Sequence, residues 1–217
     1  MPRVADIALA IIGLILSAPI LLLAAIAIKL DTRGPVFYRQ RRVGLGGATF
    51  EMWKLRTMAH GAPLGGVWDP LTADDPRITR VGAFLRKTSL DELPNLFNVL
   101  RGEMAIVGPR PTISEQVSEY TPRQRRRLEV KPGITGWAQI NGREEIGWEQ
   151  RFVLDRWYVD HWSLWLDIKI ILRTVWIVLK REGISQPGHV TMGDFLGSSS
   201  LERSDTLYDS LMTKKEA

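Results

Sequence analysis

Residues 88–111 read TSLDELPNLFNVLRGEMAIVGPRP, and this stretch combines strong local folding signals with two adjacent carboxylates. Pro94 lacks a backbone N–H and fits only the first turn of a helix, so we expect a helix to begin near residues 90–94. Gly102 should end that helix, because glycine readily adopts the left-handed conformation that follows many helices. Further along, Pro109-Arg110-Pro111 predicts a rigid turn.

Asp91 and Glu92 lie at the expected helix start, and the pair has two interpretations. The first is structural, because Ser89 and Glu92 match the S-x-x-E capping box and acidic side chains are favoured at the positive end of a helix dipole. The second is chemical, because adjacent carboxylates repel each other unless a cation lies close. Mg²⁺ is such a cation, and it commonly takes one or two carboxylates together with phosphate oxygens. These residues alone leave both interpretations open.

Basic residues on both sides of the carboxylates favour the chemical interpretation. Arg86, Lys87 and Arg110 could hold phosphate oxygens, and arginine offers two parallel donors for this purpose. An aspartate can also attack phosphorus and form an aspartyl phosphate. The three histidines are scattered along the chain, and the GxSxG, HExxH and dinucleotide-binding patterns do not occur. We therefore place the candidate chemistry at the two carboxylates.

Residues 7–28 contain no charged side chain and predict a membrane segment. A straight helix of this length would extend about 33 Å, enough to cross the hydrocarbon core. A secretory signal peptide also begins with a basic residue and an apolar run, but this run is long and no cleavage pattern precedes a polar start. Pro19, in the middle, predicts a kink, and Ser17 could partly satisfy a backbone group that the proline frees.

Both flanks of this segment are basic, and this bears on its topology. Arg3 precedes it, and five basic residues follow it: Lys29, Arg33, Arg39, Arg41 and Arg42. Basic flanks favour the cytoplasmic side of a membrane. A broken helix that enters and leaves by the same face satisfies both flanks, whereas a spanning helix satisfies only one. The residues themselves leave the two topologies open.

The remaining sequence predicts an α/β fold that is mostly helical. Two strands, 36–42 and 49–55, should form a short β-hairpin around a glycine-rich turn. Helices are expected over 77–87, 114–129, 148–159 and 165–181, with loops over 60–76 and 131–142. The last two helices carry Trp157, Trp162, Trp165 and Trp176 among charged residues. This pattern is typical of interfacial amphipathic helices, and a tryptophan-rich core is the alternative.

Composition limits the function classes. The 217 residues include no cysteine, which excludes disulfides, thiolate metal sites and a cysteine nucleophile. The net charge of +5 and the membrane segment together predict anionic partners, either lipid headgroups or an anionic substrate. Nucleic acid is the competing partner, through the arginines of residues 123–127. Such a cluster is more often a solvated or lipid-facing helix face, and no recognition motif accompanies it, so we expect no nucleic acid.

Several long motifs resemble a known family. SLDELPNLFNVLRGEMAIVGPRP (89–111), VKPGITGWAQINGR (130–143) and LDRWYVDHWSLWLDIKIIL (154–172) are similar to the monotopic phosphoglycosyl transferases of bacteria, also called bacterial sugar transferases. KLRTM (54–58) and GHVTMGDF (188–195) match as well. The resemblance runs from the membrane segment to about residue 195. The length of the chain resembles that of the small, minimal-domain members.

The resemblance implies an enzyme that transfers a sugar 1-phosphate from a UDP-sugar to polyprenyl (undecaprenyl) phosphate and releases UMP. Its site would lie at the cytoplasmic face of the bacterial inner membrane, next to the lipid bilayer. It implies a re-entrant membrane helix over 1–33 and a cytosolic catalytic domain over 34–195. We expect residues 196–217 to form a polar, disordered tail. Ser17 and Pro19 resemble the family's helix break, although Ala18 separates them where close relatives place serine directly before proline.

The resemblance also implies roles for individual residues. Asp91 matches the nucleophile that forms a covalent aspartyl phosphosugar in a ping-pong mechanism, and Glu92 matches the partner that binds Mg²⁺ beside Asp91. Arg86 matches a phosphate-holding arginine, and Pro109, Arg110 and Pro111 match a motif that lies by the nucleotide. Further candidates for substrate binding are Lys54, Arg56, Arg143 and Asp167. The sequence identifies no particular sugar, polyprenol length, pathway, protein partner or oligomeric state.

One rival class is a membrane-anchored module without catalytic activity. In such a module the carboxylates would only cap a helix, and the basic residues would only bind anionic lipid.

Overall fold

The structure is a computed structural model that describes residues 1–62, 75–142 and 146–180. Arg143, the GHVTMGDF motif and the predicted tail at 196–217 lie outside the described residues. The division of the chain into three parts therefore stays a prediction.

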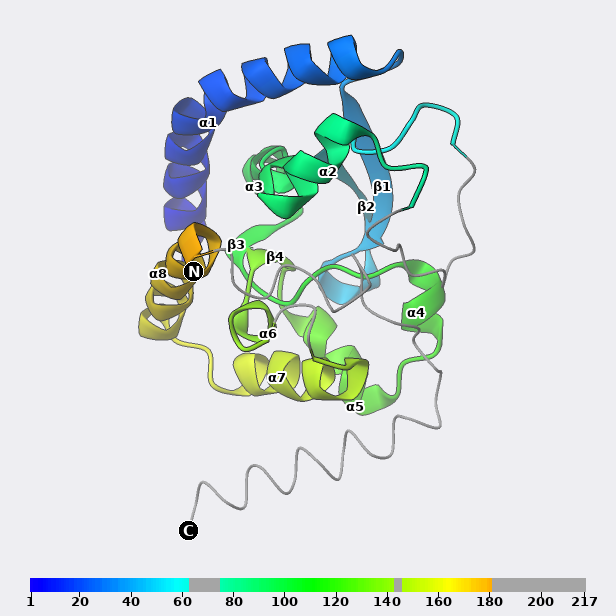
Figure 1. Cartoon of the computed structure of the whole chain (residues 1–217). Coiled ribbons are helices and arrows are strands. Elements are labelled where there is room, and N and C mark those ends of the chain that lie inside the picture. Colours follow the sequence, from blue (N-terminus) through cyan, green and yellow to red (C-terminus); the bar gives the residue numbers. More distant parts are fainter. Residues whose placement is uncertain (63–74, 143–145, 181–217) are drawn as a thin grey trace.

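The described part is mostly helical with one short antiparallel strand pair, as predicted (Figure 1). The helices are α1 (Arg3–Asp31), α2 (Arg80–Lys87), α3 (Asn95–Arg101), α4 (Ser114–Ser118), α5 (Pro122–Arg125), α6 (Trp137–Ile140), α7 (Trp148–Asp160) and α8 (Leu164–Lys180). The strands are β1 (Phe37–Val43), β2 (Thr49–Leu55), β3 (Ala105–Val107) and β4 (Gly133–Thr135), and the single 3₁₀ turns are η1 (Leu45–Gly47), η2 (Leu90–Glu92) and η3 (Arg126–Glu129).

Strands β1 and β2 form the predicted hairpin, with Phe37 opposite Leu55 and Val43 opposite Thr49. Gly46 and Gly47 have φ angles of 62° and 87°, which explains the need for glycine in the turn. A second pair, β3 and β4, is parallel and was not predicted. Gly133 lets these strands meet closely, because a Cβ atom there would collide with the Gly108 backbone.

Helix α1 is the longest element, and it is long and apolar enough to cross a membrane. Its ribbon bends sharply about halfway along, where Pro19 lies (Figure 1). The first limb packs Ala10 in a cluster with Leu96 and Val99 of α3. The second limb packs in another cluster, whose buried members are Ala24, Ile28, Leu55 and Leu85. Most of the remaining apolar side chains of α1 are exposed.

The expected repair at Pro19 takes a slightly different form. Ser17 is buried, and its hydroxyl donates to the Leu14 carbonyl at 3.4 Å. The carbonyl that Pro19 frees is that of Ile15, since the proline cannot donate to the residue four positions earlier. Ser17 therefore supports the helix just before the break and does not satisfy the freed carbonyl itself.

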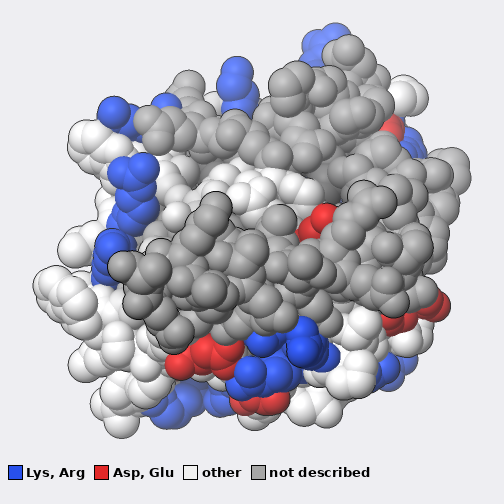
Figure 2. All heavy atoms as spheres, turned by 90° about the horizontal axis from the view of Figure 1, so that it is seen from below, with Lys and Arg blue, Asp and Glu red and all other residues white. Residues whose placement is uncertain are grey.

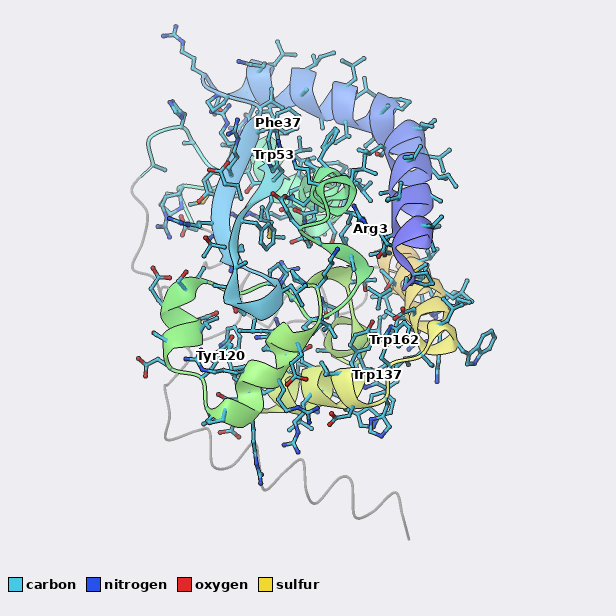
Figure 3. All side chains as sticks on the ribbon, turned by 180° about the vertical axis from the view of Figure 1, so that it is seen from behind. Arg3, Phe37, Trp53, Tyr120, Trp137 and Trp162 are labelled. Atoms are coloured by element: carbon cyan, nitrogen blue, oxygen red, sulfur yellow. The ribbon has the colours of Figure 1, made fainter. Side chains whose placement is uncertain are left out.

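The beginning of α1 is tied to the rest of the domain by polar contacts. The guanidinium of Arg3 donates to the carbonyls of Val99 at 2.6 Å and Leu100 at 2.9 Å, near the end of α3. Figure 3 shows Arg3 pointing from α1 toward that helix. Asp6 accepts from the Ile106 amide at 3.0 Å. A basic side chain at the end of a helix satisfies carbonyls that have no partner within the helix.

The helix predicted over 114–129 is wrong, because the chain breaks it into α4, α5 and η3. Thr121 and Gln124 form a capping box with Pro122 at the first helical position, so a new helix starts there. The helix predicted over 77–87 begins at Arg80, because Thr79 caps it by accepting from the Gly82 amide at 2.9 Å. Helices α7 and α8 occur where they were expected.

The tryptophans of the last two helices divide between core and surface. Trp157 stacks on Trp137 at 4.7 Å between ring centroids and packs against the cluster of Tyr158 and Ile170. Trp165 and Trp176 of α8 are 73% and 49% exposed. Their helix buries Leu166, Ile170 and Ile177 and leaves an apolar face uncovered: Leu164, Trp165, Ile168, Leu172, Val175 and Trp176.

Candidate active site

Asp91 and Glu92 lie on η2, a single 3₁₀ turn ahead of α3. Ser89, just before it, has a φ angle of 56° and is the one residue other than glycine with positive φ in the described ranges. The predicted capping box is wrong, because the Ser89 side chain makes no cap hydrogen bond in this turn. An N-cap residue needs an extended backbone, and Ser89 is left-handed. Strain of this kind is concentrated at functional sites.

Helix α3 begins at Asn95, with Pro94 as its N-cap, slightly later than predicted. Its end is as predicted, since Gly102 adopts a φ angle of 84°. The two carboxylates are therefore presented by an irregular turn, and the regular helix behind them supplies a rigid base.

Glu92 is held by two cations from other parts of the chain. Arg110, in the turn after β3, donates to both Glu92 oxygens, at 3.1 Å and 2.6 Å. Lys54, on β2, donates to Glu92 Oε1 at 2.8 Å. Burial opposes ionisation, but the charges and hydrogen bonds of Arg110 and Lys54 outweigh it and hold the pKa of Glu92 well below its usual range. Glu92 is thus ionised near neutral pH.

The pKa of Asp91 is shifted in the opposite direction from that of Glu92. Its side chain is buried, and burial together with the charge of Glu92 raises the pKa of Asp91 to about 6, against the pull of Lys54, Arg86 and Arg110. Near neutral pH the group is mainly ionised, yet it is more basic than an ordinary aspartate. A perturbed carboxyl beside several cations is typical of a functional site.

Arg86 reaches this site from the last turn of α2. Its Nε donates to Thr57 Oγ1 at 2.8 Å, and burial lowers the pKa of Arg86 while the charges of Asp91 and Asp75 oppose that shift. Helix α2 lies close to the chain at Thr57, because a Cβ atom at Gly82 would collide with the Thr57 backbone. Thr57 was not among the predicted site residues, although it belongs to the KLRTM motif.

Two of the predicted substrate-binding residues lie elsewhere. Arg56 donates to the carbonyls of Thr32 and Arg33 and so joins the end of α1 to β2. Asp167 is fully buried at the start of α8, where it accepts from Tyr158 at 2.7 Å and Trp162 at 3.0 Å and pairs with the amino terminus. Their contacts indicate structural positions, and the structure does not bring them into the carboxylate site.

The turn that carries Arg110 rests on a buried network, which we call the Arg127 network: Arg127, Asp155, Tyr120 and Thr112. The Arg127 guanidinium donates to the Arg110 carbonyl at 2.9 Å and to the Tyr120 hydroxyl at 2.8 Å, and it pairs with Asp155 at 2.6 Å. Tyr120 in turn donates to Thr112 Oγ1 at 3.1 Å. The network thereby holds the chain at Arg110 and at Thr112, two residues later.

The exposed placement expected for the arginines of residues 123–127 is correct for Arg123 and Arg125 but wrong for Arg127. Arg127 is 3% exposed and belongs to the interior, while Arg126 is partly exposed and pairs with Asp160 at 2.7 Å and Glu129 at 3.4 Å. Figure 2 shows the molecule from below, and basic side chains there lie next to acidic ones along the lower edge. In the described part of the chain, these two arginines face carboxylates.

The donor set at the two carboxylates fits a hard divalent cation. No cluster of three or more metal-ligating side chains occurs within residues 1–62, 75–142 and 146–180. Mg²⁺ needs fewer protein ligands, since it typically keeps several waters and binds one or two carboxylates plus substrate phosphates. Asp91 and Glu92 supply such a pair, and a carboxylate that accepts from Lys54 and Arg110 still has lone pairs for a metal.

The site thus consists of two adjacent carboxylates, with Asp91 buried and the cations Lys54, Arg86 and Arg110 around them. The model of the bacterial sugar transferase family matches residues 1–181, so the chain belongs to this family. The resemblance inferred from the motifs is therefore confirmed.

Similar proteins carry related names. The chain is 47% identical over 199 residues to the uncharacterized sugar transferase EpsL of Bacillus subtilis, which covers 92% of this chain and 97% of that protein. It is 47% identical over 181 residues to the UDP-glucose:undecaprenyl-phosphate glucose-1-phosphate transferase of Escherichia coli, covering 80% and 39%. It is 40% identical over 195 residues to the undecaprenyl-phosphate galactose phosphotransferase of Salmonella typhimurium, covering 83% and 41%. The chain thus spans about two-fifths of the latter two proteins.

Proposed function

We propose that this protein transfers a sugar 1-phosphate from a UDP-sugar to polyprenyl phosphate and releases UMP. The observation that carries the proposal is the pairing of a buried, basic Asp91 with a Glu92 that Lys54 and Arg110 keep ionised. Undecaprenyl phosphate appears in the names of several relatives, and a UDP-sugar appears in some of them. The site would work at the cytoplasmic face of the bacterial inner membrane, where the soluble UDP-sugar meets the lipid acceptor.

In the first step, a carboxylate oxygen of Asp91 attacks the phosphorus that bears the sugar. The bond from that phosphorus to the bridging oxygen breaks, and its electron pair leaves with UMP. The product is an aspartyl phosphosugar on Asp91. Arg86 lies beside Asp91 and would hold oxygens of the transferred phosphoryl group. The cations around the dyad offset the repulsion between an anionic nucleophile and an anionic substrate.

In the second step, a phosphate oxygen of the polyprenyl phosphate attacks the same phosphorus. The bond from phosphorus to Asp91 breaks, the carboxylate is regenerated, and the polyprenyl diphosphate sugar is released. Neither step needs a proton donor, because every attacking or leaving oxygen is an ionised phosphate or carboxylate. One nucleophile serves both substrates in turn, which gives ping-pong kinetics.

Mg²⁺ is the metal that this donor set would take, through Glu92 and Asp91, and it would neutralise charge on the diphosphate. The contribution of the chain itself is to keep both ligands ionised near neutral pH. Arg110 and Lys54 do this for Glu92, and they limit the rise of the pKa of Asp91.

We also propose that α1 enters and leaves the membrane by one face. The support is its sharp bend at Pro19 and the packing of both limbs against the same domain (Figure 1). The exposed apolar face of α8, with Trp165 and Trp176, would lie at the lipid surface. Because the chain contains no cysteine, Pro2→Cys and Arg33→Cys can be labelled singly with an impermeant maleimide. Labelling of both from the cytoplasmic side only is expected, and labelling from opposite sides would contradict the topology.

The transfer itself is tested by UMP release from a panel of UDP-sugars with undecaprenyl phosphate and Mg²⁺. Without the lipid acceptor, the wild-type protein should release about one equivalent of UMP and gain the mass of a sugar phosphate on the peptide that contains Asp91. Asp91→Asn should show neither, whereas Glu119→Gln, an exposed carboxylate on another surface, should show both. Turnover by Asp91→Asn would refute the nucleophile, and a wild-type protein that uses no UDP-sugar would refute the function.

A further inference from the structure

Arg42, on β1, is a basic residue that the proposed steps do not yet use. The next residue, Val43, donates its amide to the Thr112 carbonyl at 2.8 Å, so the end of β1 is joined to the chain just after the Pro109-Arg110-Pro111 turn. The charges that act on the Arg42 guanidinium include those of Arg110 and Glu92. Arg42 therefore lies beside the candidate active site.

The polar contacts of Arg42 leave much of its donor capacity uncommitted. Its Nη2 donates to Gln40 at 2.7 Å, while its Nε is buried and has no hydrogen-bond partner among the residues that the structure describes. No carboxylate in those same ranges forms an ion pair with Arg42, and Glu92 pairs with Lys54 and Arg110. Arginine carries five donors, and burying a cation without an anion is costly.

The site as a whole carries an excess of positive charge. In the described part of the chain, four cations surround two carboxylates: Lys54, Arg86, Arg110 and Arg42 against Asp91 and Glu92. A bound phosphate oxyanion would remove this imbalance and supply the acceptor that Arg42 Nε lacks. Arginine is well suited to that role because its planar fork matches a phosphate group.

A nucleoside diphosphate sugar has two phosphates, one that is transferred and one that leaves, and the position of Arg42 favours contact with the second. The Asp91 charge acts on Arg86, and the charges of Glu92 and Arg110 act on Arg42. In phosphoryl transfer the leaving oxygen lies roughly in line with the attacking oxygen, on the far side of the phosphorus. The leaving nucleotide phosphate therefore lies away from the attacking oxygen of Asp91, and the strand of Arg42 is joined to the turn whose Arg110 binds the neighbouring Glu92.

We propose that Arg42, together with Arg110, binds the nucleotide phosphate of the UDP-sugar and of the UMP product. This assignment rests on the proposed function and names a phosphate-binding residue for it. Arg86 would serve the phosphoryl group that is transferred, and Arg42 the phosphate that leaves.

The neighbouring Arg41 provides a matched control. It is exposed, and it donates to Thr49 Oγ1 at 3.2 Å and 3.3 Å, away from the carboxylates. Successive residues of a strand point to opposite faces, so Arg41→Gln and Arg42→Gln remove the same charge from the same strand on opposite sides.

The experiment measures product inhibition by UMP, KM for the UDP-sugar and KM for undecaprenyl phosphate. In Arg42→Gln, the inhibition constant for UMP and KM for the UDP-sugar should rise about tenfold or more, the effect of losing a charged hydrogen bond. KM for undecaprenyl phosphate should stay within about twofold of wild type, because the lipid phosphate does not use Arg42. Arg42→Lys should recover part of the loss, and Arg41→Gln should behave as wild type.

The outcomes separate this assignment from the proposed function. An unchanged UMP inhibition constant in a folded and active Arg42→Gln would overturn the role of Arg42 alone. A selective rise in KM for undecaprenyl phosphate would do the same and would point to the acceptor phosphate. A wild-type protein that releases no UMP would overturn both. If Arg42→Gln fails to fold, UMP binding to Arg42→Lys by calorimetry decides, and wild-type affinity there would refute the assignment.

Discussion

The carboxylate site and the Arg127 network contain the same residue types. They differ in whether each charged side chain pairs with one of opposite charge. In the Arg127 network, Arg127 and Asp155 are 3% and 1% exposed and pair directly at 2.6 Å. Burial raises the pKa of Asp155 and of Asp91 alike, but in the carboxylate site the charge of a second carboxylate, Glu92, raises the pKa of Asp91 further. Cations there outnumber carboxylates among the described residues. The two regions meet at Arg110, whose side chain binds Glu92 and whose carbonyl accepts from Arg127.

This difference separates two roles for charge inside a protein. A closed network, in which each ion has its partner, fixes a geometry and gains nothing from a ligand. An open cluster keeps charges in an unfavourable balance that an anionic substrate can relieve. Function at such a site therefore has a cost in stability, and the closed network beside it holds the turn in place.

The largest expected effect on stability comes from opening the closed network. Arg127→Met leaves Asp155 buried without its nearest cation, which should lower the free energy of unfolding by about 3–5 kcal/mol. Arg126→Met is the matched control, since its exposed pairs should contribute about 0–1 kcal/mol. Chemical unfolding in detergent compares the two variants. Equal losses would show that the Arg127 network is not a closed, buried unit.

The carboxylate site should respond mainly in activity. Glu92→Gln removes the charge that Lys54 and Arg110 surround, and it removes half of the carboxylate pair. We expect kcat/KM to fall about 10²–10³-fold, comparable to the loss of one electrostatic group in an active site. The free energy of unfolding should fall by about 1–3 kcal/mol, because Lys54 and Arg110 lose the carboxylate that both of them bind. A variant with near-normal turnover would show that one carboxylate suffices.

Much of the fold followed from local sequence, and the failures have physical reasons. The hairpin was predictable because two strand-like segments flank Gly46 and Gly47, and the end of α3 because Gly102 suits a left-handed cap. The pairing of β3 with β4 was not predictable, because strands of three residues show no periodicity. The break between α4 and α5 did have a readable signal, since Thr121-Pro122 and Gln124 match a capping box.

From local sequence alone, the candidate site was predictable only where its residues adjoin one another; Lys54, which binds Glu92, was predicted from the family resemblance. Asp91, Glu92, Arg86 and Arg110 all lie in or next to the 88–111 stretch, and the structure gathers them. Arg42 and Thr57 reach the site through the hairpin and the chain after it, and no local pattern marks them. The burial of Arg127 depends on its pairing with Asp155, which lies on α7 and is distant in sequence. Without such a partner, a cluster of arginines predicts an exposed helix face.

Asp91→Asn tests the stability cost of the open site. Burial and the Glu92 charge raise the pKa of Asp91 from an ordinary 3.8 to about 6, so the folded protein holds this proton more tightly than the unfolded chain. The stability that the protonated form provides is present below about pH 4 and is lost as pH rises to about 6. Asparagine mimics the protonated form, so the variant should exceed wild type by about 1–3 kcal/mol above pH 6.

The difference should vanish below about pH 4, where Asp91 is protonated in the folded and the unfolded chain. Melting curves from about pH 3 to about pH 8 in EDTA measure this difference without a contribution from metal. Glu119→Gln is the control, and its difference from wild type should not follow this pH course. A variant that is less stable than wild type at pH 8 would contradict the electrostatic account of Asp91.

Tyr120→Phe probes whether the Arg127 network tolerates a smaller loss. The substitution removes the hydroxyl that joins Arg127 to Thr112 but keeps the ring that packs against Phe152 at 5.0 Å between centroids. We expect a loss of about 1 kcal/mol in stability. Turnover should stay within about threefold of wild type, because Arg127 still holds the Arg110 carbonyl. Glu119→Gln, at an exposed position outside the network, is the control. A large fall in kcat without a change in melting temperature would show that the hydroxyl, and not Arg127, sets the position of Arg110.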